Sequence, residues 1–181
     1  MMKALRKTIP SVVKRTANSQ GVPIKNFFSA MLVFFSRFIK IMPNFSLVGS
    51  FGFFQKNLLL FFAQILAFDL LISGLYPGFL FSYLGFFSYW LFGRLANNSI
   101  KKQALLLPLA SFFFFLFSNF GVWWYWYPRN LAGLTTCYTL ALPFYRNTLL
   151  GDLFFGAVII GVSLLIKKLP QKVTRSQASY V

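Results

Sequence analysis

Long apolar runs separated by short polar breaks are the dominant pattern along the chain. A membrane-spanning helix needs roughly 20 mainly apolar residues, because each residue adds about 1.5 Å and the hydrocarbon core is about 30 Å thick. Runs near this length cover residues 26–42, 57–75, 104–126 and 149–166, and shorter runs cover residues 45–54, 79–92 and 131–142. Alternation at period two is absent, so the pattern predicts an all-α polytopic transmembrane helix bundle.

The ends of these runs are marked by proline, glycine and polar residues. Breaks fall at residues 43–44, at residues 76–78 and in the polar loop 93–103, while Pro128 and Pro143 flank the run 131–142. That last run is too short to cross a bilayer alone. We expect it to be either a re-entrant or surface-lying helix over a cavity, or an outer loop packed on the helix ends.

The basic residues predict the orientation. The chain has 18 Lys and Arg residues against two Asp and Glu residues. The Lys and Arg residues cluster before the first run, in the loop 93–103 and after the last run. Such residues are retained on the cytoplasmic side of a membrane. If the run 45–54 crosses and the run 131–142 does not, about six crossings place every basic segment inside, giving an N-in/C-in topology.

Three segments follow from this pattern. Residues 1–25 form a basic flexible N-terminal tail, residues 26–168 the transmembrane helical domain, and residues 169–181 a basic C-terminal tail. The N-terminal tail combines Lys, Arg, Ser and Thr with no acidic residue, which is also typical of an organelle transit peptide. The expected location is therefore the cell inner membrane, or alternatively an organelle inner membrane, with the lipid bilayer as the main partner.

Composition excludes several classes of protein. The chain is 57% hydrophobic and 11% charged, whereas soluble domains carry about 25% charged residues. A single Cys rules out a disulfide scaffold, and the lack of His rules out a His-based metal site or nucleophile. The sequence contains no Walker A motif and no aromatic-basic nucleic-acid module. We therefore expect no enzyme activity, no cofactor, no metal and no nucleic-acid partner.

The two carboxylates are Asp69 and Asp152. Asp69 lies roughly 18 Å along its predicted helix, and Asp152 lies in the first turn of the predicted last helix, so both fall in the outer half of the bilayer. An ionisable group at this depth is a candidate functional site. The structural alternative is that each carboxylate pairs with an outer-side cation, or that Asp152 caps a helix N-terminus. The cations available for pairing are Arg37, Lys40, Arg129 and Arg146.

An aromatic block at residues 123–127 ends the fifth long helix of this scheme. Trp and Tyr residues gather at membrane–water interfaces, which favours an interfacial belt. The same rings are also suited to form a stacking wall for a planar ligand, with Asn119, Arg129 and Asn130 as polar groups beside it. Both interpretations are compatible with the sequence.

Three short motifs and one aspartate carry a resemblance to known families. The motifs are Pro43 to Gly49, Ser118 to Trp123, and Pro143 to Asp152, and the aspartate is Asp69. On these motifs, roughly residues 30–167 resemble an uncharacterised bacterial multi-pass membrane protein family. More distantly, the layout is similar to the substrate-binding S components of energy-coupling-factor transporters.

The second resemblance implies a ligand site in the outer half of the membrane. It also implies a membrane coupling partner with ATPases, although the Ala-x-x-x-Ala docking pattern of those S components is absent because Ala30 is followed by Phe34. The substrate-binding residues that it implies are Asn44, Asp69, Asn119, Trp123, Arg146 and Asp152.

The leading interpretation is a small-molecule binding or transport subunit that takes its energy from a partner or a gradient. The alternative is a non-transporting accessory or scaffold subunit of a larger membrane complex. In that alternative the Phe-rich faces contact other proteins and Asp69 forms a structural ion pair.

Overall fold

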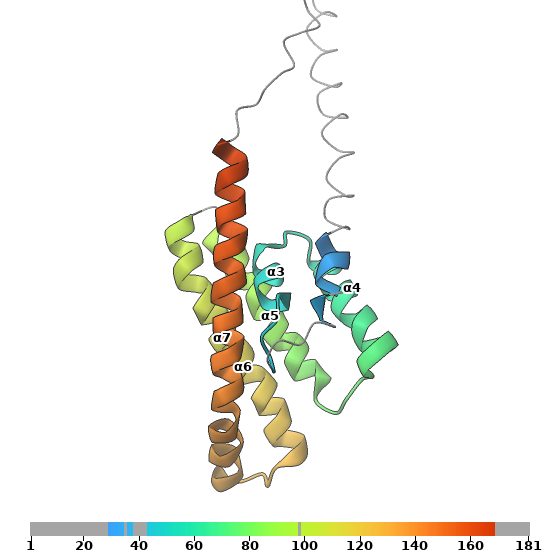
Figure 1. Ribbon diagram of the computed structural model, residues 1–181. Helices are drawn as coiled ribbons and strands as arrows, with labels where there is room; N and C mark the ends of the chain where they lie inside the picture. The colour runs from blue at the N-terminus through green and yellow to red at the C-terminus, as the bar shows by residue number, and fades with distance from the viewer. Residues whose placement is uncertain (1–28, 35, 38–42, 98, 169–181) are drawn as a thin grey trace, which may run out of the picture.

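A computed structural model describes residues 29–34, 36–37, 43–97 and 99–168, which form helices joined by short turns and contain no strand (Figure 1). The all-α fold class is therefore confirmed for the described part of the chain. The predicted tails, 1–25 and 169–181, lie outside the described residues, as does much of the first predicted span.

The described helices follow one another with short connections. After the helical residues 29–34 come α3 (Val48–Phe54), α4 (Leu58–Phe68), the π-helix η1 (Asp69–Ser73), α5 (Phe79–Ala96), α6 (Ile100–Trp126) and α7 (Leu131–Lys168). In Figure 1, α7 runs along the described structure with α6 antiparallel to it, α3 and α4 lie to one side, and α5 crosses from that side toward the start of α6.

Two clusters of buried side chains hold these helices together. One cluster joins the first helical segment to α3 and α4, and the other joins α3 to α5 and α6. Their buried members are Ala30, Val33, Val48, Phe51, Phe61 and Ile65 in the first, and Phe53, Tyr89, Ala96, Leu107 and Ala110 in the second. Because α3 belongs to both clusters, it lies at the centre of the described fold.

Helix α7 corrects the expectation for residues 131–142. These residues are neither a re-entrant segment nor an outer loop, since they form the first part of one continuous helix with Pro143 in its interior. Proline removes one backbone hydrogen bond from a helix, but packing on both sides of it holds the helical conformation. Tyr138 donates a hydrogen bond to the Leu116 carbonyl at 2.7 Å, and the Tyr145 ring packs on Phe115 with centroids 4.7 Å apart.

Helix α5 also extends further than its apolar run predicts. It continues through Gly93 to Ala96, so the connection to α6 shrinks to residues 97–99. A Cβ atom at position 93 would collide with the backbone carbonyl of Phe53. Gly93 therefore allows α3 and α5 to approach closely and does not end the helix.

Two helices, α6 and residues 131–166 of α7, are long and apolar enough to span a membrane. Only 28% and 17% of their most apolar windows are buried, whereas the core helix of a water-soluble protein is mostly buried. The seven-residue α3 rises roughly 10 Å, about a third of a hydrocarbon core, so it cannot cross alone. The expected count of about six crossings is therefore not confirmed.

Candidate functional site

A cavity of about 1170 Å³ lies where the described segments meet. Drug-sized ligands occupy pockets of roughly 300–1,000 Å³, so this space accommodates a small molecule. Charged and polar side chains share its wall with aromatic rings from α4, α5 and α6. The lining residues used below are Arg37, Asn44, Ser46, Gly49, Phe68, Ser73, Phe86, Tyr89, Phe114, Thr148 and Asp152.

Asp152 is surrounded by hydroxyl groups from three other helices. Its side chain is buried, and Ser111 of α6 donates a hydrogen bond to its Oδ2 atom at 2.5 Å. Tyr89 of α5 donates to the same oxygen, and Ser50 of α3 lies 3.4 Å from Oδ1 and 2.9 Å from the Asp152 carbonyl oxygen. The carboxylate thus ties α7 to α3, α5 and α6.

This environment corrects two expectations for Asp152. Because α7 begins at Leu131, Asp152 lies in the middle of the helix and does not cap its N-terminus. Among the described residues, the only ion pair involves a different carboxylate, so hydroxyl donors take the place of the expected cation. Gly49 makes room for this arrangement, since a Cβ atom there would collide with Asp152 Oδ1 and with the Tyr89 ring.

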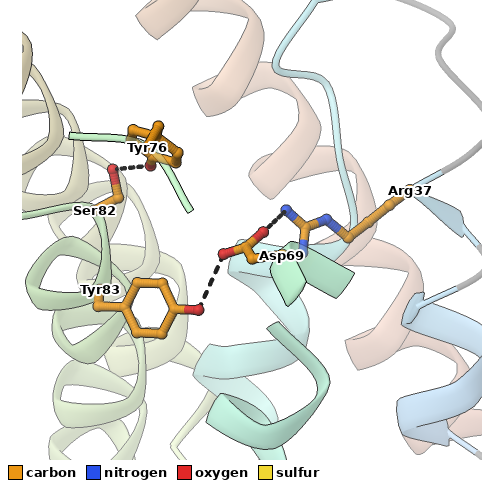
Figure 2. Close-up of polar contacts among 5 residues, drawn as sticks. All are labelled: Arg37, Asp69, Tyr76, Ser82 and Tyr83. Atoms are coloured by element: carbon orange, nitrogen blue, oxygen red, sulfur yellow. Dashed lines mark hydrogen bonds and ion pairs between the residues drawn. The ribbon is translucent and has the colours of Figure 1, made fainter. Parts of the chain in front are cut away.

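Asp69 forms the second polar centre, which Figure 2 shows between Arg37 and Tyr83. Arg37 Nη2 lies 3.5 Å from Asp69 Oδ1, and the Tyr83 hydroxyl donates to Oδ2 at 3.0 Å. The Arg37 guanidinium also lies 3.9 Å from the centre of the Phe68 ring. Asp69 therefore pairs with a cation, which is the structural alternative that the sequence left open, and Arg37 is that cation.

The backbone changes at Asp69 from α-helix to π-helix. Gly74 N–H donates to the Asp69 carbonyl at 2.6 Å, which closes the wider turn of η1. The π-turn ends the helix, since Gly74 follows it with a positive φ of 74°. Beyond this turn, the Tyr76 hydroxyl lies 2.6 Å from Ser82 Oγ, and partial burial raises the pKa of the Tyr76 phenol, which keeps it neutral (Figure 2).

The cavity brings together only some of the predicted ligand residues. Asn44 and Asp152 line its wall, and Asp69 contacts the wall residue Arg37. Asn119 instead hydrogen-bonds within α6, to the Phe115 carbonyl at 2.8 Å, and Trp123 donates to the Pro128 carbonyl. These last two residues, the aromatic block 123–127 and the exposed Arg146 do not line the cavity.

Sequence reasoning missed the hydroxyl donors around Asp152 and the tyrosine beside Asp69. Ser50, Ser111, Tyr83 and Tyr89 lie in ordinary apolar runs with no motif around them. The available signal was indirect: a buried carboxylate requires hydrogen-bond donors, and hydroxyl-bearing residues on neighbouring helices are the natural source.

Comparison with known proteins gives a family but no activity. No curated protein and no solved structure matches the chain significantly. A family model described as a family of unknown function, DUF6580, matches residues 22–174, which include every described element. The chain therefore belongs to the DUF6580 family.

Proposed function

We propose that this protein is an integral membrane protein that binds a small molecule in the cavity beside Arg37, Asn44 and Asp152, as the binding subunit of a transport system. The observation that carries the proposal is the cavity itself. Its volume of about 1170 Å³ is slightly above the roughly 300–1,000 Å³ of ligand pockets, and its wall combines aromatic rings with a few polar groups, as ligand sites do.

The apolar exterior supports a membrane location. Large side chains such as Leu105 and Leu165 are 72% and 66% exposed, and similar residues continue along α6 and α7. Lipid is the solvent that suits such a surface, since soluble monomers rarely expose apolar patches of more than a few hundred Å². We assign the protein to the cell inner membrane on the basis of its basic loops and tails.

We propose that the loop at residues 97–99 and the C-terminal end of α7 face the cytoplasm. Helices α5, α6 and α7 run in alternating directions, which agrees with a cytoplasmic loop at residues 97–99 and an outer turn at residues 127–130 (Figure 1). Asp152 is then roughly 24 Å along α7 from Lys168, in the outer half of the bilayer. The cavity would therefore receive its ligand from the outer side.

Transport requires energy that this chain does not provide. Its sequence lacks a phosphate-binding Walker A loop, so a membrane coupling partner with ATPases, or an ion gradient, would supply it. The accessory-subunit alternative predicts a defined multi-subunit assembly without a bound small molecule.

A test uses a pair of matched tryptophan substitutions on α7. Thr148 lines the cavity and bonds to the Phe144 carbonyl at 3.0 Å, whereas Thr135 is exposed and makes the equivalent bond to Leu131 at 3.0 Å. Native mass spectrometry of the purified protein should find a co-purified small molecule in the wild type and in Thr135→Trp, but not in Thr148→Trp.

Unchanged occupancy of the molecule in Thr148→Trp would contradict the proposal, because the indole would reduce the space left for a molecule beside Asn44 and Asp152. A defined larger assembly with no small molecule in any variant would favour the accessory-subunit alternative.

A further inference from the structure

We propose that the ligand of the cavity carries an oxyanion, either a carboxylate or a phosphate, which binds at the guanidinium of Arg37. The argument is that the two carboxylates at the site have hydrogen-bond donors, whereas part of the guanidinium has no acceptor. This inference rests on the proposed function, because it names the ligand class of the same cavity.

The carboxylates at the site are already supplied with donors. Asp152 is 1% exposed and is contacted by three hydroxyl groups. Asp69 is 5% exposed, with Arg37 on one oxygen and Tyr83 on the other. Neither carboxylate therefore presents a free acceptor to a cationic ligand, and a cation would have to displace these partners.

The guanidinium of Arg37, in contrast, has donors without acceptors. Arginine carries five N–H groups, and the one contact of Arg37 with a carboxylate is long, at 3.5 Å. Its Nη1 atom is buried and has no hydrogen-bond partner among the described residues. A buried charged donor that lacks an acceptor is unfavourable, so an acceptor supplied by a ligand would remove that penalty.

Arg37 is positioned to reach such an acceptor. Its side chain is 19% exposed and forms part of the cavity wall, beside the ring of Phe68. Because its Nη1 atom is buried, binding requires a rotation about the terminal bonds of this side chain that turns the guanidinium toward an occupant of the cavity. The planar fork of donors matches the geometry of carboxylate and phosphate groups.

The remaining wall complements an acid with an apolar body. The side chains of Asn44, Ser46 and Ser73 line the cavity and have no hydrogen-bond partner among the described residues, so they add neutral donors. The rings of Phe86 and Phe114, whose centroids are 4.8 Å apart, provide an apolar surface. An aromatic or aliphatic acid fits this arrangement better than an amine.

The experiment uses isothermal titration calorimetry to measure how three small probes, each with one phenyl ring, bind to the protein in detergent. Benzoate carries the oxyanion, benzamide is its neutral isostere and benzylamine its cationic counterpart. We expect the wild type to bind benzoate, and Arg37→Met to bind it at least about tenfold more weakly. Arg129→Met is the matched control, since Arg129 also lies over an aromatic ring, at 4.7 Å from Trp124, but outside the cavity.

A second variant keeps the test valid if Arg37→Met leaves Asp69 unpaired and the protein fails to fold. Asp69→Asn retains an acceptor for Tyr83 and releases the guanidinium from its carboxylate. We expect this variant to bind benzoate more tightly than the wild type. Weaker binding in folded Asp69→Asn would overturn the proposal.

Two sources of oxyanion are separated by further probes. Inorganic phosphate and benzoate represent soluble anions, while nanodiscs of phosphatidylglycerol, compared with phosphatidylcholine, represent lipid headgroups. If only phosphatidylglycerol stabilises the protein, and only when Arg37 is present, the oxyanion site is correct and its ligand is a lipid headgroup. If none of these anions binds in a way that depends on Arg37, the proposed oxyanion site is wrong.

The two proposals fail in different ways. If benzamide or benzylamine binds independently of Arg37 and is excluded by Thr148→Trp, the small-molecule cavity stands and the oxyanion site is wrong. If no probe binds and no molecule co-purifies, both are wrong.

Discussion

At the scale of single residues, Asp152 and its three hydroxyl partners dominate the polar interior. They join α7 to α3, α5 and α6 through one carboxylate, so four helices depend on one side chain. A buried carboxylate with its donors in place stabilises the packed arrangement, whereas removal of either side leaves polar groups unsatisfied.

Replacement of Asp152 by Ala should destabilise the protein strongly. It leaves the Tyr89 hydroxyl without its carboxylate acceptor, whereas Ser111 Oγ also lies 3.3 Å from the Leu107 carbonyl oxygen. A buried orphan group costs about 1–3 kcal/mol. Thermal unfolding in detergent should show a clearly lower midpoint for Asp152→Ala and a smaller decrease for Asp152→Asn, which keeps an acceptor oxygen. Equal midpoints for wild type and Asp152→Ala would show that the hydroxyl cluster does not hold the helices together.

The glycine beside this cluster gives a second prediction at the same scale. Gly49→Ala places a Cβ atom against Asp152 and Tyr89, and overpacking of this kind costs typically about 1–3 kcal/mol. Gly161→Ala is the matched control, because no atom lies within 4 Å of its Cβ position and alanine favours the helix by up to about 1 kcal/mol. The melting midpoint should fall for Gly49→Ala and should not fall for Gly161→Ala. The reverse order would contradict the close packing of α3 on α7.

At the scale of helices, the sequence predicts the type of element, but several boundaries differ in the structure, among them the end of α5, the start of α6 and the start of α7. Proline and glycine ordinarily end helices, so the sequence predicts breaks at Pro143 and Gly93. In the structure both lie inside helices, because neighbouring helices supply the contacts that hold the backbone in place. The predicted break at residues 76–78 is confirmed, since Gly74 just before it and Gly78 at its end have positive φ angles of 74° and 88°, which do not continue a right-handed helix.

The continuous α7 predicts the outcome of one substitution. Pro143→Ala restores the missing backbone donor within a helix that already continues through this position, and interior proline is less favourable than alanine by about 3 kcal/mol in exposed helices. We expect a thermal midpoint in detergent equal to or above that of the wild type. A large decrease would indicate that the helix needs the local geometry of proline there.

At the scale of the whole molecule, orientation in the membrane governs access to the cavity. Cysteine labelling tests it in a Cys137→Ala background, which removes the one native cysteine. Arg129→Cys and Lys101→Cys both place thiols at exposed positions, at opposite ends of α6. A membrane-impermeant maleimide should label intact cells at position 129, and at position 101 only after permeabilisation.

Labelling of position 101 from outside would reverse the topology and place the outer turn in the cytoplasm. Labelling of neither position without permeabilisation would indicate a location in an internal membrane.

The sequence alone determined the helical fold class and the identity of the two carboxylates, because hydrophobic content, run length and charge are properties of the local chain. It left open whether Asp69 pairs with a cation or contacts a ligand, because a buried charge requires compensation but the sequence does not say which group supplies it. Only the tertiary structure decided that Arg37 pairs with Asp69 and that hydroxyl groups surround Asp152. It also decided that Asn44 lines the cavity while Asn119 and Trp123 do not. Those outcomes depend on which helix faces meet, and contacts between residues distant in the chain leave no periodic signal in the sequence.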